Sequence, residues 1–272
     1  MQQRTMGSAY NNRYQRIDKG ISSAFVYSLS VRMIFDKAFI SEIGGRSINE
    51  DAAAIFEDHK MVIAAVADGL GGHGSGDIAS KIALETLRLH LGNLKPPLEE
   101  SLRTLCVAMN QAVVEAQKHV ARMKTTLALA LVDEDTLVCM HIGDSRVYHF
   151  HDGQIRYQSL DHSVSQLAVF AGEIKPDQIR FHEDRNRVLR ALGDNEGVNP
   201  EIHVFQHTLQ PGDSLLTCTD GFWEYVREEE MLSALYSTRS AAEWLSSMRE
   251  LIRLRASQGS DNYSAAAIRF FV

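Results

Sequence analysis

The sequence predicts an α+β fold in which an antiparallel sheet structure is covered by helices. Two observations lead to this fold class. Four short β-prone runs follow one another between residues 126 and 158, and Asp133-Glu-Asp135 and Asp152-Gly153 separate neighbouring runs, as in hairpins. The long helical patterns come in pairs, at 79–91 with 98–120 and at 228–235 with 241–255. Hairpins combined with paired helices favour antiparallel sheets over a doubly wound parallel sheet.

The first elements that the sequence predicts are a strand and a helix. Met61–Ala67 is a continuous apolar run that ends in Asp68-Gly69, which predicts a buried strand entering a turn. After a glycine-rich stretch to Gly76, apolar residues recur at helical spacing until Gly92-Asn93 and Pro96-Pro97 break the pattern. We expect one face of this helix to lie on the core.

The later elements continue the alternation of helices and strands. Apolar residues recur at steps of four and three from Leu98 to Val120, which we interpret as the core face of a second helix. Residues 161–194 are polar and partly helical, and connecting stretches of this length often carry function. Ser214–Thr217 predicts a buried strand ahead of Asp220-Gly221, and Ser264–Val272 predicts a closing strand.

Composition describes a soluble single-domain protein. The chain has 272 residues with 44% hydrophobic residues and a net charge of −7, and this acidic balance argues against nucleic acid as a main partner. Its three cysteines match no zinc motif, and we expect them to be reduced, as in the cytoplasm. No apolar run is long enough to span a membrane. We expect residues 1–30 to form a poorly ordered arm and residues 31–272 to form one domain that is a monomer.

Four short acidic segments carry the candidate chemistry. They are Arg46-Ser-Ile-Asn-Glu-Asp51, Asp68-Gly-Leu-Gly-Gly-His-Gly74, Thr219-Asp-Gly-Phe222 and Gly259-Ser-Asp-Asn262. Each places an aspartate at or beside a turn, and carboxylates gathered at strand ends suit hard cations such as Mg²⁺ or Mn²⁺. One carboxylate can bridge two cations, and a water held between them loses a proton readily. Arg46 is placed to clamp phosphoryl oxygens.

Each segment also has an ordinary interpretation. A single Asp-Gly pair is far more often a turn than a ligand. Arg46 alone fits an exposed surface residue, and Asn49-Glu50-Asp51 fits a helix cap. His73 lies in a glycine-rich turn, where a structural role is the default. The combination of all four segments, rather than any one of them, indicates a metal-dependent site.

Nine motifs in a fixed order resemble those of the metal-dependent PP2C-type (PPM) serine/threonine protein phosphatases in their compact bacterial form. They are Arg46-Ser-Ile-Asn-Glu-Asp-Ala52, Val66-Ala-Asp-Gly-Leu-Gly-Gly-His-Gly-Ser-Gly76, Thr125-Thr126, His141-Ile-Gly-Asp-Ser-Arg-Val-Tyr148, Leu160-Asp-His-Ser163, Ala171-Gly-Glu-Ile174, Val188-Leu-Arg-Ala-Leu-Gly193, Ser214-Leu-Leu-Thr-Cys-Thr-Asp-Gly221 and Gly259-Ser-Asp-Asn262. They span about residues 40–272. The resemblance implies a four-layer α-β-β-α sandwich of two mainly antiparallel sheets flanked by helix pairs.

The resemblance also implies roles for individual residues at a dinuclear Mg²⁺ or Mn²⁺ centre. Asp68 is expected to bridge two cations, while Gly69 supplies its carbonyl. Further ligands are expected at Asp220 and Asp261 for the first cation, at Glu50 and Asp51 for the second, and at Asp144 for a third, weaker cation. Arg46 is expected to bind phosphate. The segment 168–187 corresponds to a mobile flap beside the cleft.

One position departs from the eukaryotic members of the family. They place a histidine, a candidate general acid, directly after the Asp-Gly turn, whereas this chain has Leu70. Either His73 or a metal-bound water is left as the proton donor.

These expectations leave three hypotheses. The first is hydrolysis of phosphoserine and phosphothreonine on proteins, reversing a cognate serine/threonine kinase in bacterial signalling. The alternatives are a catalytically weak regulatory or binding module of the same fold, which usually lacks a metal aspartate, and a two-metal nuclease, which the negative charge disfavours.

Overall fold

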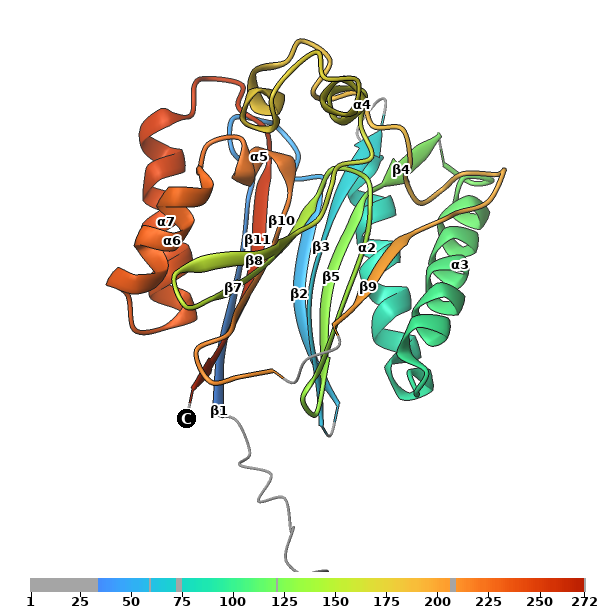
Figure 1. The fold of residues 1–272 in the computed structure, drawn as a ribbon. Coiled ribbons are helices and arrows are strands. Elements are labelled where there is room, and N and C mark those ends of the chain that lie inside the picture. The colour runs from blue at the N-terminus through green and yellow to red at the C-terminus, as the bar shows by residue number, and fades with distance from the viewer. Residues whose placement is uncertain (1–33, 59, 72–74, 121, 206–208, 272) are drawn as a thin grey trace, which may run out of the picture. The chain divides into compact units, whose positions relative to one another are not determined.

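The computed structural model describes residues 34–58, 60–71, 75–120, 122–205 and 209–271 (Figure 1). The arm expected over residues 1–30 and the candidate acid His73 lie outside these residues. Within them, no helix is both long enough and apolar enough to cross a membrane.

Two antiparallel sheets form the centre of the fold. The first has the strand order β1-β11-β10-β7-β8 and the second β2-β3-β5-β6-β9, with β4 paired to β3. Their bounds are Ile34–Glu42 (β1), Asp51–Asp58 (β2), Met61–Gly71 (β3), Met123–Thr125 (β4), Leu127–Asp133 (β5), Thr136–Ile142 (β6), Arg146–His151 (β7), Gln154–Gln158 (β8), Glu201–Val204 (β9), Ser214–Cys218 (β10) and Tyr263–Phe271 (β11). The predicted hairpins β5–β6 and β7–β8 are confirmed.

Helix pairs cover the outer faces of both sheets (Figure 1). Helices α2 (Gly76–His90) and α3 (Leu98–Ala116) pack through buried leucines such as Leu87 and Leu102 onto the second sheet. Helices α6 (Glu228–Ser237) and α7 (Ala241–Arg255) place Met231 and Trp244 in the apolar cluster of the first sheet. The shorter elements are α4 (Val164–Phe170), α5 (Asp220–Trp223), η1 (Leu91–Asn93) and η2 (Pro176–Phe181). The predicted α+β sandwich is therefore confirmed.

The uninterrupted apolar run of β3 follows from its position. Val62–Ala67 is buried throughout, because helices cover one face of its sheet and the other sheet covers the opposite face. Polar residues appear only where the strand reaches the end of the sandwich, at Asp68. Four strands meet the candidate segments at this end, since β2 starts at Asp51, β10 ends two residues before Asp220, and β11 starts two residues after Asp261.

Helix α3 is shorter than its apolar pattern predicts. It ends at Ala116 rather than at Val120. The side-chain amide of Gln117 donates to the carbonyl oxygens of Met123 (2.7 Å) and Gly193 (2.8 Å). These bonds tie the end of the helix to the segments around Met123 and Gly193, while turns replace the helix over residues 117–120.

Candidate metal centre

Backbone pairing between β2 and β3 brings two predicted ligands together. In the antiparallel register Asp51 lies directly opposite Asp68, and the Gly69 N–H donates to the Glu50 carbonyl oxygen at 3.1 Å. A Cβ on Gly69 would lie 2.1 Å from the carbonyl oxygen of Gly76. Only glycine therefore permits the start of α2 to approach this strand so closely.

The first sheet contributes the other two aspartates. Asp220 is the first residue of α5 and is separated from β10 by Thr219 alone, and Asp261 lies just before β11. The Thr219 hydroxyl donates to the carboxylate of Asp51 at 2.8 Å, which ties the ends of the two sheets together. Asp51, Asp68, Asp220 and Asp261, which span 211 positions of the sequence, thus meet at one end of the sandwich.

Asp144 joins this group from the turn between β6 and β7. Its side chain is buried, and its Oδ1 has no hydrogen-bond partner among the described residues. A buried, unsatisfied carboxylate oxygen costs free energy unless a cation or a water binds it. The predicted association of Asp144 with the acidic group is therefore supported by its surroundings.

The electrostatics of the group are those of carboxyls crowded in a buried place. Burial, together with the charge of Asp220, raises the pKa of Asp51 to about 8 despite the bond from Thr219. Burial, with the charges of Glu224 and Asp261, raises the pKa of Asp220 to about 7. The pKa values of Asp68 and Asp144 are raised well above their usual range, first by burial and then by the charge of Asp220. Divalent cations would offset this repulsion, and a donor set made only of oxygens suits Mg²⁺ or Mn²⁺.

These shifts predict how the stability of the metal-free protein depends on pH. A carboxyl whose pKa is higher in the folded than in the unfolded chain binds more protons when folded, so stability falls as pH rises from about 4 towards 8. Asp220 alone, shifted from 3.8 to about 7, corresponds to roughly 4 kcal/mol. We expect the urea midpoint of unfolding, measured with a chelator, to fall across this range, and saturating Mn²⁺ to remove the fall. The same pH profile with and without Mn²⁺ would contradict the assignment.

Glu50 and Arg46 occupy the rim of the group. The Glu50 carboxylate accepts the Gly76 N–H at 2.9 Å, so one of its oxygens caps the start of α2. The Arg46 guanidinium donates to Asp261 at 2.8 Å, although the two residues are 215 positions apart in the sequence. About half of the Arg46 side chain is exposed. It therefore lies beside the acidic group with surface available to a ligand.

Asn262 has a positioning role that the sequence did not reveal. Its side-chain oxygen accepts the Glu50 N–H at 2.8 Å, and its Nδ2 donates to the carbonyl oxygens of Ile43 (2.8 Å) and Ile48 (3.0 Å). One amide thereby fixes the loop that carries Arg46 and Glu50. The only available signal was its place directly after Asp261.

The structure also gathers a second group of metal-binding residue types. Ligand atoms of His141, His162 and Glu201 lie within 4.8 Å of one another, and this is the one such trio within the described part of the chain. The Gly143 N–H donates to Nδ1 of His162 at 3.2 Å, which places the proton of the neutral ring on Nε2. Because Nε2 then offers no lone pair, we assign the candidate centre to the aspartates. Among the described residues no three of the aspartates bring their ligand atoms as close as this, although the carboxyls of Asp68 and Asp220 are hydrogen-bonded to each other.

Comparison with known proteins points to one family. The family model described as Protein phosphatase 2C matches residues 41–262. The chain is 34% identical over 210 residues to "Serine/threonine phosphatase stp" of Listeria welshimeri, covering 73% of this chain and 81% of that protein. It is similar in structure to the catalytic domain of the serine/threonine protein phosphatase PstP in complex with two manganese ions, with a TM-score of 0.74, 29% identity, and coverage of 88% of this chain and 100% of that one. A structure titled as a bacterial serine phosphatase gives a TM-score of 0.77 at 27% identity, with coverage of 86% and 97%.

Proposed function

The chain belongs to the protein phosphatase 2C family and is a metal-dependent serine/threonine protein phosphatase, and from this premise we propose that it works through a dinuclear Mg²⁺ or Mn²⁺ centre held by the aspartates of both sheets. The observation that carries the proposal is the meeting of Asp51, Asp68, Asp220 and Asp261, where burial and neighbouring carboxylates raise the pKa values of the first three. The two manganese ions named with the PstP structure support the number of cations.

We assign ligand roles by position in this group. Asp68 is central, because both Asp51 and Asp220 act on its pKa, and it would bridge the two cations with the Gly69 carbonyl beside it. Asp220 and Asp261 would hold the first cation. Glu50 and Asp51 would hold the second directly or through water, and Asp144 a third, weaker one. When bound, the cations would acidify a water nucleophile and neutralise charge on the phosphoryl group.

The protein residues supply orientation around that chemistry. Arg46 would turn from Asp261 towards the phosphoryl oxygens, where its planar fork can donate two hydrogen bonds and stabilise negative charge. No serine, cysteine or histidine nucleophile is needed. Leu70 lies on β3 opposite Lys124. Because the leucine side chain is apolar, the position directly after Asp68-Gly69 provides no proton. The leaving hydroxyl would be protonated by His73 or by water.

The substrate would be a protein that a serine/threonine kinase has phosphorylated, since this class of reaction must supply phosphoserine and phosphothreonine. We place the enzyme in the cytoplasm as a monomer. The free, buried state of Cys106, Cys139 and Cys218 supports a reducing compartment.

Turnover of a phosphothreonine peptide tests the function. We expect release of inorganic phosphate with Mn²⁺ or Mg²⁺ and none with excess chelator, and readdition of Mn²⁺ should restore it. The same protein given single-stranded and duplex DNA should not cleave either. Full activity in chelator would refute the proposal, and binding of Mn²⁺ without turnover would favour a regulatory module.

A further inference from the structure

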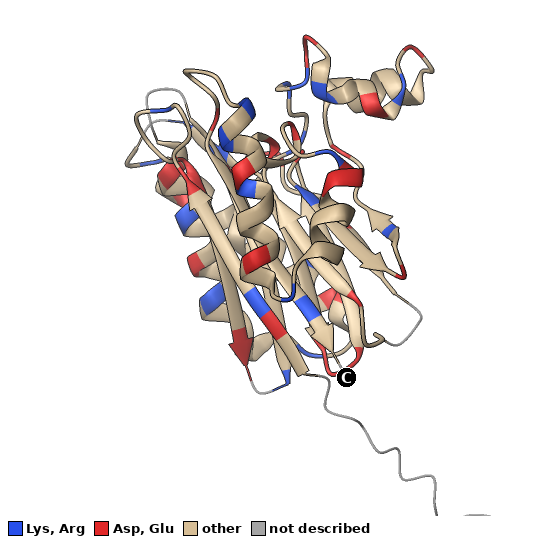
Figure 2. Cartoon of the chain, turned by 90° about the vertical axis from the view of Figure 1, so that its left-hand side faces the viewer, with Lys and Arg blue, Asp and Glu red and all other residues tan. Residues whose placement is uncertain are grey.

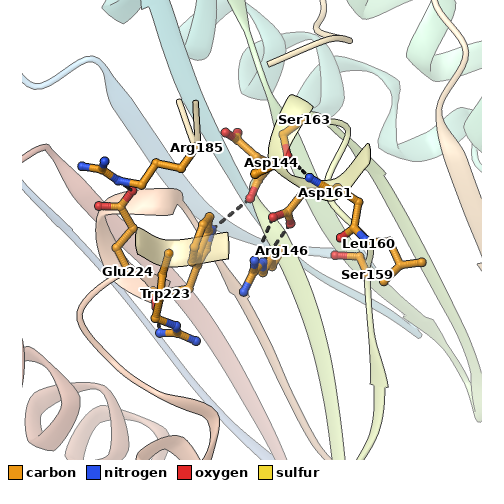
Figure 3. Close-up of polar contacts among 12 residues, drawn as sticks. Asp144, Arg146, Ser159, Leu160, Asp161, Ser163, Arg185, Trp223 and Glu224 are labelled. Carbon is orange, nitrogen blue, oxygen red and sulfur yellow. Dashed lines mark hydrogen bonds and ion pairs between the residues drawn. The ribbon is translucent and has the colours of Figure 1, made fainter. Parts of the chain in front are cut away.

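Trp223 links two of the aspartates of the candidate centre. It is the last residue of α5, three positions after Asp220, and it is buried. Its indole Nε1 donates to the backbone carbonyl oxygen of Asp144 at 2.9 Å, as Figure 3 shows. A single side chain therefore ties the turn that carries Asp144 to the helix that carries Asp220.

The indole ring is held by a buried ion pair. The Arg146 guanidinium lies 3.6 Å from the centroid of the Trp223 ring. Two hydrogen bonds of 2.8 and 2.7 Å join it to both carboxylate oxygens of Asp161, and the two side chains are 4% and 1% exposed (Figure 3). A planar fork bound at two points cannot rotate freely. The ring stacked on it is fixed in turn.

The flap segment 168–187 contacts the backbone next to this ring. Arg180 of η2 donates to the carbonyl oxygens of Trp223 and Val226, and its other terminal nitrogen donates to Glu228 at 2.6 Å. Arg185 donates to the next residue along the chain, Glu224, at 2.7 Å (Figure 3). Two arginines of this segment therefore help to hold the backbone of Trp223 and the side chain that follows it.

Asp144 depends on its backbone for orientation. Its Oδ1 has no partner among the described residues, so no side chain aims that oxygen. The residue before it, Gly143, has a φ of 103°, which only glycine adopts readily. The bond from Trp223 fixes the carbonyl on the other side of this turn. His162 holds Gly143 by two further bonds, so loss of the Trp223 bond would release the Asp144 carbonyl and shift its carboxylate without unfolding the turn.

We propose that Trp223, stacked on Arg146 and bonded by Arg180, is a positioning residue that aims the Asp144 carboxylate at a divalent cation. This inference rests on the proposed function, because it requires the Asp144 cation.

The test compares two matched tryptophan variants of the full chain. Trp223→Phe keeps the stacked ring and loses the indole donor. Trp244→Phe, in α7, also loses a 2.9 Å bond from a buried indole, here to the Met231 carbonyl. We measure Mn²⁺ binding by the electron paramagnetic resonance of free Mn²⁺ and stability by urea unfolding. Trp223→Phe should weaken the weakest of three binding steps about tenfold and leave the others unchanged, whereas Trp244→Phe should change none.

Fluorescence and a flap variant give independent readouts. The chain has two tryptophans, so emission of Trp244→Phe reports Trp223 alone, and it should change at the Mn²⁺ concentrations of the weakest step. Arg180→Gln should weaken the same step.

The outcomes separate this inference from the proposed function. A wild-type protein that binds only two Mn²⁺ ions would overturn the inference, as would Trp223→Phe with wild-type binding, or equal weakening by Trp244→Phe. These results leave phosphatase activity intact. Absence of turnover by the wild-type protein would refute the proposed function instead.

Discussion

Asparagine in place of Asp68 is expected to lower kcat on a phosphothreonine peptide by at least about 10³-fold, which corresponds to about 4 kcal/mol of transition-state stabilisation. The reason is the central position of this carboxyl between Asp51 and Asp220. An amide carries no charge and cannot bridge two cations through two anionic oxygens. Initial rates should be measured at saturating substrate with Mn²⁺, with Mg²⁺ and with neither ion, because excess cation will not restore a missing bridge.

The same variant should be more stable than the wild-type protein when metal is absent. Burial and the charge of Asp220 raise the pKa of Asp68, so this carboxyl costs more stability as the pH rises above its unfolded pKa of 3.8. Asp68→Asn removes that charge. In chelator at pH 8 its urea midpoint should exceed that of the wild type, which excludes misfolding as the cause of lost activity. Wild-type kcat in the variant would remove Asp68 from the catalytic centre.

Alanine in place of Arg46 is expected to lower kcat/KM by about 10²-fold, the usual cost of removing one donor to transition-state charge. The guanidinium already lies 2.8 Å from Asp261, with about half of its side chain exposed towards solvent. Steady-state kinetics on phosphopeptide should show a raised KM as well as a lowered kcat, since the fork would contact phosphate before and during the reaction. Arg46→Lys should recover only part of the loss, because an ammonium does not bind two oxygens in one plane.

Metal binding provides the control for Arg46. Arg46→Ala should bind Mn²⁺ at least as tightly as the wild type, because the variant loses the cation that now pairs with Asp261. Unchanged kcat/KM in Arg46→Ala would mean that the arginine is only a surface partner of Asp261.

The sequence predicted the sandwich well where burial dictates the pattern. The run Met61–Ala67 and the hairpins from β5 to β8 were readable because the sheet is covered and turn residues separate its strands. Strands β1 and β2 were not predicted. β1 lies at an edge with alternate residues exposed, and β2 contains three consecutive alanines, which have low β propensity. β9 was not predicted either, because it is only four residues long and mostly exposed.

The residues of the candidate site were likewise predictable where the signal is local in the sequence, and the contacts between distant residues were not. Asp68, Asp220 and Asp261 could be picked out because turns beside glycine or serine follow or precede apolar strands. The bonds that hold the site, from the Thr219 hydroxyl to Asp51 and from the Glu50 N–H to Asn262, join residues 168 and 212 positions apart. No local pattern encodes such pairs, because they depend on how the two sheets pack.

The ligand aspartates come from both layers of the sandwich, with Asp51 and Asp68 on one sheet and Asp220 and Asp261 beside the other. Cations held between them would act as cross-links as well as cofactors. A cell starved of manganese and magnesium would then hold a protein whose layers separate first at the catalytic end, where proteases gain access. Scarcity of these ions would then shorten the lifetime of the enzyme in addition to abolishing its activity.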